Sequence, residues 1–188
     1  MLTSLIFAIP LAIARTTSIA ILRSIAIAYS WFFRAIPSLT ILFFMYYGLP
    51  ALGIYLDAWT SAILGLSLTA AAYMTEIIRA GIRSVPAGQY ESARALGMPF
   101  WLSMRRIILP QTMRIIIPPM ASEFTAVLKG SALASLVAVA ELTGQASALI
   151  SLTYQPIPIL ASVALAYLAL NSVIVGGQAF LERRYRLG

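Results

Sequence analysis

The residues of this chain that could carry chemistry are few, and two of them stand inside an apolar stretch. Glu123 and Lys129 interrupt the apolar run from 115 to 140. Because a buried charge is costly, an ionisable residue in such a run commonly faces a cavity, a partner or a bound molecule. The two side chains point about 240° from each other around a helix, so we expect no direct ion pair between them. Glu123, Lys129 and Ser131 are our candidates for a substrate or gate role, with structural hydrogen bonding as the alternative.

The composition excludes most catalytic chemistry. Cys and His are absent, so the chain has no disulfide, thiolate metal site, imidazole base or imidazole proton relay. No segment resembles the GxxxxGK[ST] loop that binds nucleotide phosphates. A membrane enzyme would need a nucleophile with a base, or metal ligands, and few candidates remain. We therefore expect no enzyme activity, no metal and no cofactor in this chain itself.

The same composition indicates a membrane protein. Hydrophobic residues make up 61% of the chain, charged residues 10%, and the mean hydropathy is +0.90, whereas about a quarter of the residues in soluble domains are charged. A net charge of +7 could indicate nucleic-acid binding. Lys and Arg lie between apolar runs, however, and not on a solvated face. We therefore expect the lipid bilayer as a partner, and no nucleic acid.

The elements that would position Glu123 and Lys129 are membrane-spanning helices. One crossing takes about 20 residues, so this chain has room for about five. Four apolar blocks have this length or nearly so: 35 to 56, 58 to 78, 115 to 140 and 157 to 181. A fifth, from Met1 to Ala14, is short, and we expect it to be the second half of a span whose beginning is missing. The expected fold is all-helical and polytopic, with residues 1–188 forming a single transmembrane domain.

The arginines indicate which side of the membrane each connection faces. Residues 79–114 have a net charge of +5. Further basic residues follow the first block and end the chain: Arg15, Arg23, Arg183, Arg184 and Arg186. The connections at 48–57 and 141–155 contain no Lys or Arg. Because basic loops stay in the cytoplasm, five crossings would place every basic cluster there, with the C-terminus inside.

Two local expectations follow from the charges. Residues 24–33, between Arg23 and Arg34, would suit a helix at the inner membrane surface, before the chain turns into the membrane at Pro37. Glu76 and Arg79 are spaced to form an ion pair on one helix face.

The strongest signal is the loop at 86–110, which reads PAGQYESARALGMPFWLSMRRIILP. A short helix would begin at Pro86, with Glu91 in its first turn, where a carboxylate suits the helix dipole. Gly97 can adopt the left-handed conformation that ends such a helix. The pattern therefore predicts a helix followed by a sharp turn.

A second helix would follow this turn. Pro99 can start it, and it would run through Ile108 until Pro110 enters the next span. The small side chains of the first helix would let it lie deep in a partner's groove: Ser92, Ala93 and Ala95. The alternative is an ordinary basic loop.

At these residues the chain resembles the importer-type permeases of the ABC transporter superfamily. Their signature is a Glu-Ala-Ala motif, a Gly shortly after it, and an Ile-x-Leu-Pro ending. Here it reads Glu91-Ser92-Ala93, Gly97 and Ile107-Ile108-Leu109-Pro110. Ser92 departs from the middle Ala, one small residue for another.

The chain is similar, over nearly its whole length, to the polar amino-acid uptake branch of that family. Residues 34–50 resemble the branch's FRGTP to YYGLP segment. Further segments follow in the same order: Glu76, Arg79-Ala80-Gly81-Ile82, Gly88-Gln89, Pro110-Gln111, Arg114, Pro118-Pro119, Leu128-Lys129 and Glu141-Leu142-Thr143. The chain departs from the branch at Ala35-Ile36, at Ser122 and at 130–132.

The resemblance implies a type I ABC importer permease fold, with a cytoplasmic coupling loop at about 81–110. The resemblance implies that a separate ATPase contacts the following residues: Gly88, Gln89, Glu91, Ser92, Ala93, Gly97 and Pro110. The implied partners are ATP-binding cassette ATPase subunits, a second permease that is identical or related, and an extracytoplasmic solute-binding protein. The implied location is the bacterial inner membrane, and the cargo is a polar amino acid moved by alternating access.

Two alternatives remain open at this point. One is an importer of the same kind for another small polar solute. The other is an ion-coupled secondary transporter, which should show coupling carboxylates at the membrane midplane and repeat symmetry. Only Glu123 is a candidate carboxylate, and no repeat is visible.

Overall fold

The computed structural model describes residues 1–185, and all regular structure within them is helical. The α-helices are α1 (Leu2–Thr16), α2 (Ala20–Ala35), α3 (Ser38–Phe43), α4 (Ala58–Ser84), α5 (Ala87–Ala95), α6 (Phe100–Ser103), α7 (Leu109–Gly130), α8 (Leu142–Thr153) and α9 (Pro156–Tyr185). Short π-helical and 3₁₀ segments adjoin them: η1 (Phe44–Gly48), η2 (Leu49–Leu52), η3 (Met104–Ile108) and η4 (Ser131–Val137). The expected all-helical fold is confirmed.

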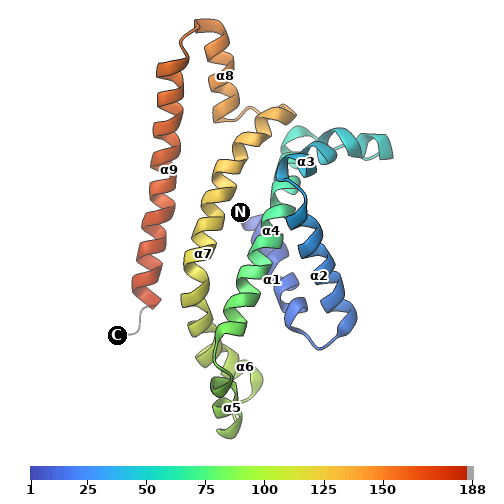
Figure 1. The fold of residues 1–188 in the computed structure, drawn as a ribbon, viewed down its shortest axis with the longest axis vertical. Coiled ribbons are helices and arrows are strands. Elements are labelled where there is room, and N and C mark those ends of the chain that lie inside the picture. The colour runs from blue at the N-terminus through green and yellow to red at the C-terminus, as the bar shows by residue number, and fades with distance from the viewer. Residues whose placement is uncertain (186–188) are drawn as a thin grey trace.

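Helix α4 lies at the centre, with α1, α2 and α7 packed along it (Figure 1). Its buried positions are small residues almost throughout, which lets neighbouring backbones approach closely, as in other membrane helix bundles. At Gly65 a Cβ would stand 3.3 Å from Cα of Leu42 on α3. At Gly81 a Cβ would overlap Cγ2 of Ile116 on α7. Glycine is therefore required at the crossing of α4 and α7.

Among residues 1–185, two helices, α4 and α9, are long and apolar enough to cross a membrane, and the number rises to four if each of two bent helix pairs is one span. The polytopic prediction is confirmed. Helix α1 has 15 residues, fewer than the roughly 20 that a crossing takes. Five crossings therefore stay a prediction.

The helix expected at the membrane surface lies elsewhere. Residues 24–33 belong to α2, which packs lengthwise on α1 and α4. The Tyr29 hydroxyl donates to the backbone oxygen of Leu68 at 2.7 Å. The Arg34 guanidinium lies 5.5 Å from the centroid of the Tyr73 ring, so it contacts the bundle. The prediction of a surface helix is wrong. The sequence shows an apolar segment flanked by arginines, but it does not show that this segment packs against other helices of the chain.

The expected span at 35–56 is not one straight helix. The chain turns by 101° between α2 and the segment Ser38–Leu52, which projects sideways from the bundle (Figure 1). The turn occurs at Ile36, whose extended backbone precedes Pro37. Proline disfavours helical geometry in the residue before it. The sequence had predicted a crossing at 35–56. In the structure, the helix that runs along the bundle in this part of the chain is α2.

The later boundaries differ as well. The helix that starts after Pro99 does not stop at Pro110 but continues through η3 into α7. Pro110 has no backbone N–H to donate, and the π-helical hydrogen bonding of η3 accommodates this missing donor. The connection expected at 141–155 contains helix α8, capped by the Glu141 carboxylate, which accepts from the N–H of Thr143 at 2.8 Å.

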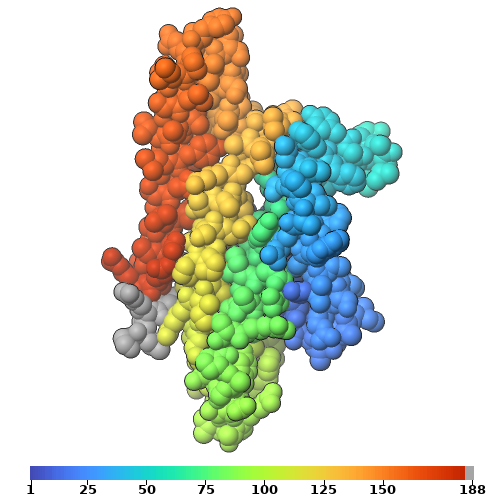
Figure 2. Space-filling model, in the orientation of Figure 1, coloured from blue at the N-terminus to red at the C-terminus, as the bar shows by residue number. Residues whose placement is uncertain are grey.

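Apart from Arg34 in the last turn of α2, the arginines flank connections that lie toward one end of the molecule. The turn between α1 and α2, the α5–α6 loop and the end of α9 all point that way (Figure 1). The space-filling view shows α5 and α6 protruding beyond the other helices at this end (Figure 2). Arg186 lies outside the described residues.

Candidate functional site

Helix α5 ends in a turn that depends on Gly97. The φ of Gly97 is +67°, a left-handed conformation that glycine adopts without strain. Its N–H donates to the Arg94 oxygen at 2.9 Å, and the Met98 N–H donates to the Ala93 oxygen at 3.0 Å. These two bonds form a Schellman motif, which satisfies carbonyl groups that the helix end leaves free. The predicted left-handed Gly97 is confirmed.

The outward face of this loop is polar along α5 and apolar at the turn. Helix α5 starts at Ala87, so Glu91 lies in its second turn. The sequence had predicted Glu91 in the first turn. The predicted coupling residues that are exposed are Gly88, Gln89, Glu91, Ser92 and Gly97. Leu96 is 78% exposed and Trp101 is 79% exposed. Such apolar side chains at a protruding turn are typical of a protein contact.

Ala93 differs from its neighbours on α5. It is 1% exposed and therefore packs within this chain. Its methyl group is not available to a partner, contrary to the expectation for the small side chains of α5.

Two side-chain bonds attach α5 to the bundle. The Tyr90 hydroxyl donates to the Ile82 backbone oxygen at 3.1 Å, near the end of α4. The Gln111 amide nitrogen lies 3.3 Å from the Gln89 amide oxygen, which brings the start of α7, with Pro110, beside α5. Burial raises the pKa of the Tyr90 phenol, so it stays a neutral donor at physiological pH. Sequence reasoning missed both bonds because they join residues of different elements.

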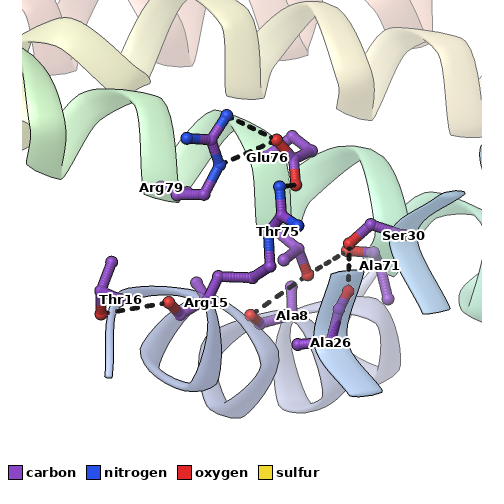
Figure 3. A network of polar contacts seen from close by, with 10 residues as sticks. Ala8, Arg15, Thr16, Ala26, Ser30, Ala71, Thr75, Glu76 and Arg79 are labelled. Carbon is purple, nitrogen blue, oxygen red and sulfur yellow. Dashed lines mark hydrogen bonds and ion pairs between the residues drawn. The ribbon is translucent and has the colours of Figure 1, made fainter. Parts of the chain in front are cut away.

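An ion cluster ties α1 to α4 (Figure 3). Nη2 of Arg15 lies 2.7 Å from Oε1 of Glu76, an ionic contact without hydrogen-bond geometry. The predicted pair of Glu76 and Arg79 is confirmed, with Nε at 2.9 Å and Nη2 at 2.8 Å from Oε2. Thr75, beside Glu76, donates to the Ala71 oxygen at 2.7 Å. Arg15 was missed as a partner, although its place at the end of the first apolar block is a signal that could have found it.

The three candidate path residues lie on the upper part of α7 and its continuation. Glu123 is half-buried and Lys129 is exposed, and neither forms an ion pair within residues 1–185. Their expected separation around the helix is consistent with this. The Ser131 hydroxyl donates to the Leu128 oxygen at 2.7 Å, where the helix tightens into η4. Pro118 and Pro119 interrupt the backbone bonds of α7 below Glu123.

The structure thus forms two separate groups of candidate residues. The coupling candidates gather on α5 and the start of α7, at the end that carries the arginines. The path candidates lie toward the opposite end of α7. No cluster of carboxylates that could hold a metal occurs in the described part of the chain.

Comparison with known proteins gives a consistent result. The family described as "Binding-protein-dependent transport system inner membrane component" matches residues 3–187. The probable amino-acid ABC transporter permease protein YckA of Bacillus subtilis (strain 168) is 40% identical over 175 residues, covering 93% of this chain and 77% of the relative. The probable glutamine ABC transporter permease protein GlnM of the same organism is 37% identical over 181 residues, covering 96% and 84%.

A solved structure has the same fold. The crystal structure of an amino acid ABC transporter with histidines matches with a TM-score of 0.88 at 33% identity. The match covers 97% of this chain and 86% of the solved one.

Proposed function

Because the chain belongs to the family of binding-protein-dependent transport system inner membrane components, we propose that it is the permease subunit of an ATP-driven importer for polar amino acids. It is a transport protein and not an enzyme, and a separate ATPase supplies the energy. The relatives named above are amino-acid ABC transporter permeases, which supports this class of cargo.

The observation that carries the coupling role is the α5–Gly97–α6 loop. It protrudes at the arginine-rich end, exposes Leu96 and Trp101, and is attached to α4 and α7 by Tyr90 and Gln111. A partner that moves α5 therefore moves the inner ends of two central helices. In this proposal, ATP binding closes two ATPase subunits, displaces the loops of two permeases, and switches access from one side to the other. A solute-binding protein delivers the cargo on the opposite side.

The path of the cargo runs along α7, past Glu123, Lys129 and Ser131. Every free amino acid carries a carboxylate, and an ammonium group in a partly desolvated path binds a carboxylate strongly. Lys129 has no ion-pair partner among the described residues and is exposed. We assign it to the cargo carboxylate.

We expect the loop at Gly88 to face the cytoplasm and Gln145 on α8 to face outward, in the bacterial inner membrane, with a cytoplasmic C-terminus. Both positions are exposed, and the chain has no native cysteine. A single Cys is introduced at either position in intact cells, which are treated with an impermeant thiol reagent. Labelling at 145 alone is the expected result. Labelling at 88 alone would reverse the assigned orientation.

We expect proteoliposomes that contain the permease, its ATPase and the binding protein to accumulate an amino acid when ATP is present. The panel also offers sugars, oligopeptides and oxyanions. Lys129→Met should raise the KM for the cargo about tenfold or more, because a hydrogen bond to a charged group contributes about 1.5–3 kcal/mol. Lys129→Arg keeps the charge and should retain most uptake.

Each other outcome identifies a different error. Uptake of only another solute would leave the importer intact and change the cargo. Uptake driven by an ion gradient without ATP would favour a secondary transporter. Unchanged KM in Lys129→Met would remove Lys129 from the path.

A further inference from the structure

A large groove opens beside the α5–α6 loop, and its lining does not include Glu123, Lys129 or Ser131. Its volume is about 1210 Å³, larger than most small-molecule sites, which measure about 300–1,000 Å³. Helices α1, α4, α7 and α9 form its walls, and α5 and α6 lie at one end. Most of its lining is apolar, as at Ile9, Ile78 and Met120. A zwitterionic amino acid would lose hydration there without gaining polar contacts.

The polar groups of this groove gather at the end near the coupling loop. Arg83, at the end of α4, Tyr90 on α5 and Gln178 near the end of α9 line that end. The other end, around Leu5 and Phe124, has only apolar side chains. The groove therefore changes from polar to apolar along its length, as one leaflet of a bilayer does.

The dimensions fit one leaflet. The lining residues of α1 run from Leu5 to Thr16, which is about 16 Å of helix at 1.5 Å per residue. Half of the hydrocarbon core of a bilayer is about 15 Å. An acyl chain can therefore lie along α1 with its headgroup at the level of Arg83.

The charge at the polar end favours an anion. Arg83 is exposed and forms no ion pair with any residue from 1 to 185. The nearby acid on α9, Glu182, accepts a hydrogen bond from Gln178 at 2.8 Å and does not line the groove. Basic pockets between membrane helices on the cytoplasmic side are known to bind anionic lipid headgroups.

We propose that this groove binds an anionic phospholipid from the leaflet on the α5–α6 side, with an acyl chain against α1 and α7 and the phosphate against Arg83. The lipid also contacts Tyr90 and Trp101, so it joins the coupling loop to the transmembrane helices. This site is independent of the identity of the transported solute.

The test uses fluorescence quenching of Trp101, which lines the groove. The full chain, with Trp31→Phe and Trp59→Phe, is reconstituted in phosphatidylcholine vesicles that contain brominated phosphatidylglycerol or brominated phosphatidylcholine. Brominated phosphatidylglycerol should quench at about fivefold lower content, since one basic residue near the surface contributes about 1 kcal/mol. Arg83→Gln should abolish this preference. Arg105→Gln removes an equal charge from an exposed position outside the groove and should leave the preference intact.

A second variant tests the chain-binding part of the groove. A Cβ at Gly177, which lines the groove, meets no atom within 4 Å, so Gly177→Leu should fold normally and reduce quenching by both lipids. Equal quenching by the two lipids, or equal loss in Arg83→Gln and Arg105→Gln, would overturn the proposal. Absence of quenching by either lipid would mean that a second copy of this chain covers the groove, which also overturns the proposal. Competition by inorganic phosphate would reassign Arg83 to a free anion.

Discussion

Replacing Glu76 by Gln should strongly destabilise this protein, because it removes the only acid of the Arg15–Glu76–Arg79 cluster seen in residues 1–185. The Glu76 side chain is only 15% exposed. Removing one partner of a buried pair costs about 3–5 kcal/mol, and we expect the lower end because solvent reaches part of the cluster. That loss corresponds to a decrease in Tm of about 6–12 °C for a chain of this size.

The measurement is thermal unfolding of the purified protein in detergent. Glu91→Gln is the matched control, since Glu91 is an exposed acid on α5 without an ion pair among the described residues, and its Tm should not change. Arg79→Gln should cost less than Glu76→Gln, because Arg15 still neutralises the carboxylate. A Tm of Glu76→Gln equal to that of the unmodified protein would show that the cluster contributes nothing to the attachment of α1.

Gly97→Val should abolish ATP-dependent uptake while the transmembrane helices stay folded. A side chain in the left-handed region costs about 1–2 kcal/mol, and more for a β-branched residue, so the ratio of the native turn to other turn conformations should fall about 5- to 30-fold. Space is not the reason, because a Cβ at Gly97 meets no atom within 4 Å. The expected defect is therefore a misplaced α6 and weaker contact with the ATPase.

Gly97→Asn separates backbone strain from the mere presence of a side chain. Asn tolerates the left-handed conformation better than other residues, so it should retain most uptake and copurify with the ATPase. Uptake in proteoliposomes and pull-down of the ATPase are measured for both variants. Normal uptake by Gly97→Val would mean that this turn does not transmit movement.

The sequence predicted best what depends on neighbours along the chain. The left-handed Gly97, the pair of Glu76 with Arg79, and the long helices α4 and α9 all rest on local spacing or composition. The bent path through Ile36 was also encoded locally, by Pro37, but its 101° turn depends on how α3 packs against α4.

The misses involve contacts between distant elements. The position of α2 along α1 and α4, the reach of Arg15 to Glu76, and the burial of Ala93 all depend on which helices meet. Periodicity shows that a face is apolar but does not name the helix that covers it. Helix α8 was missed because the lack of Lys and Arg at 141–155 was interpreted only as a sign of an outer connection.

The contact between Gly81 and Ile116 also restricts how this sequence can change over generations. A larger residue at 81 would push α4 away from α7, and the β-branched Ile116 is too stiff in a helix to turn aside. The α5–α6 loop is attached to both helices by the hydrogen bonds of Tyr90 and Gln111, so such a shift would displace the loop as well. In a lineage of this protein, a residue larger than glycine at 81 is therefore expected only together with a residue smaller than isoleucine at 116.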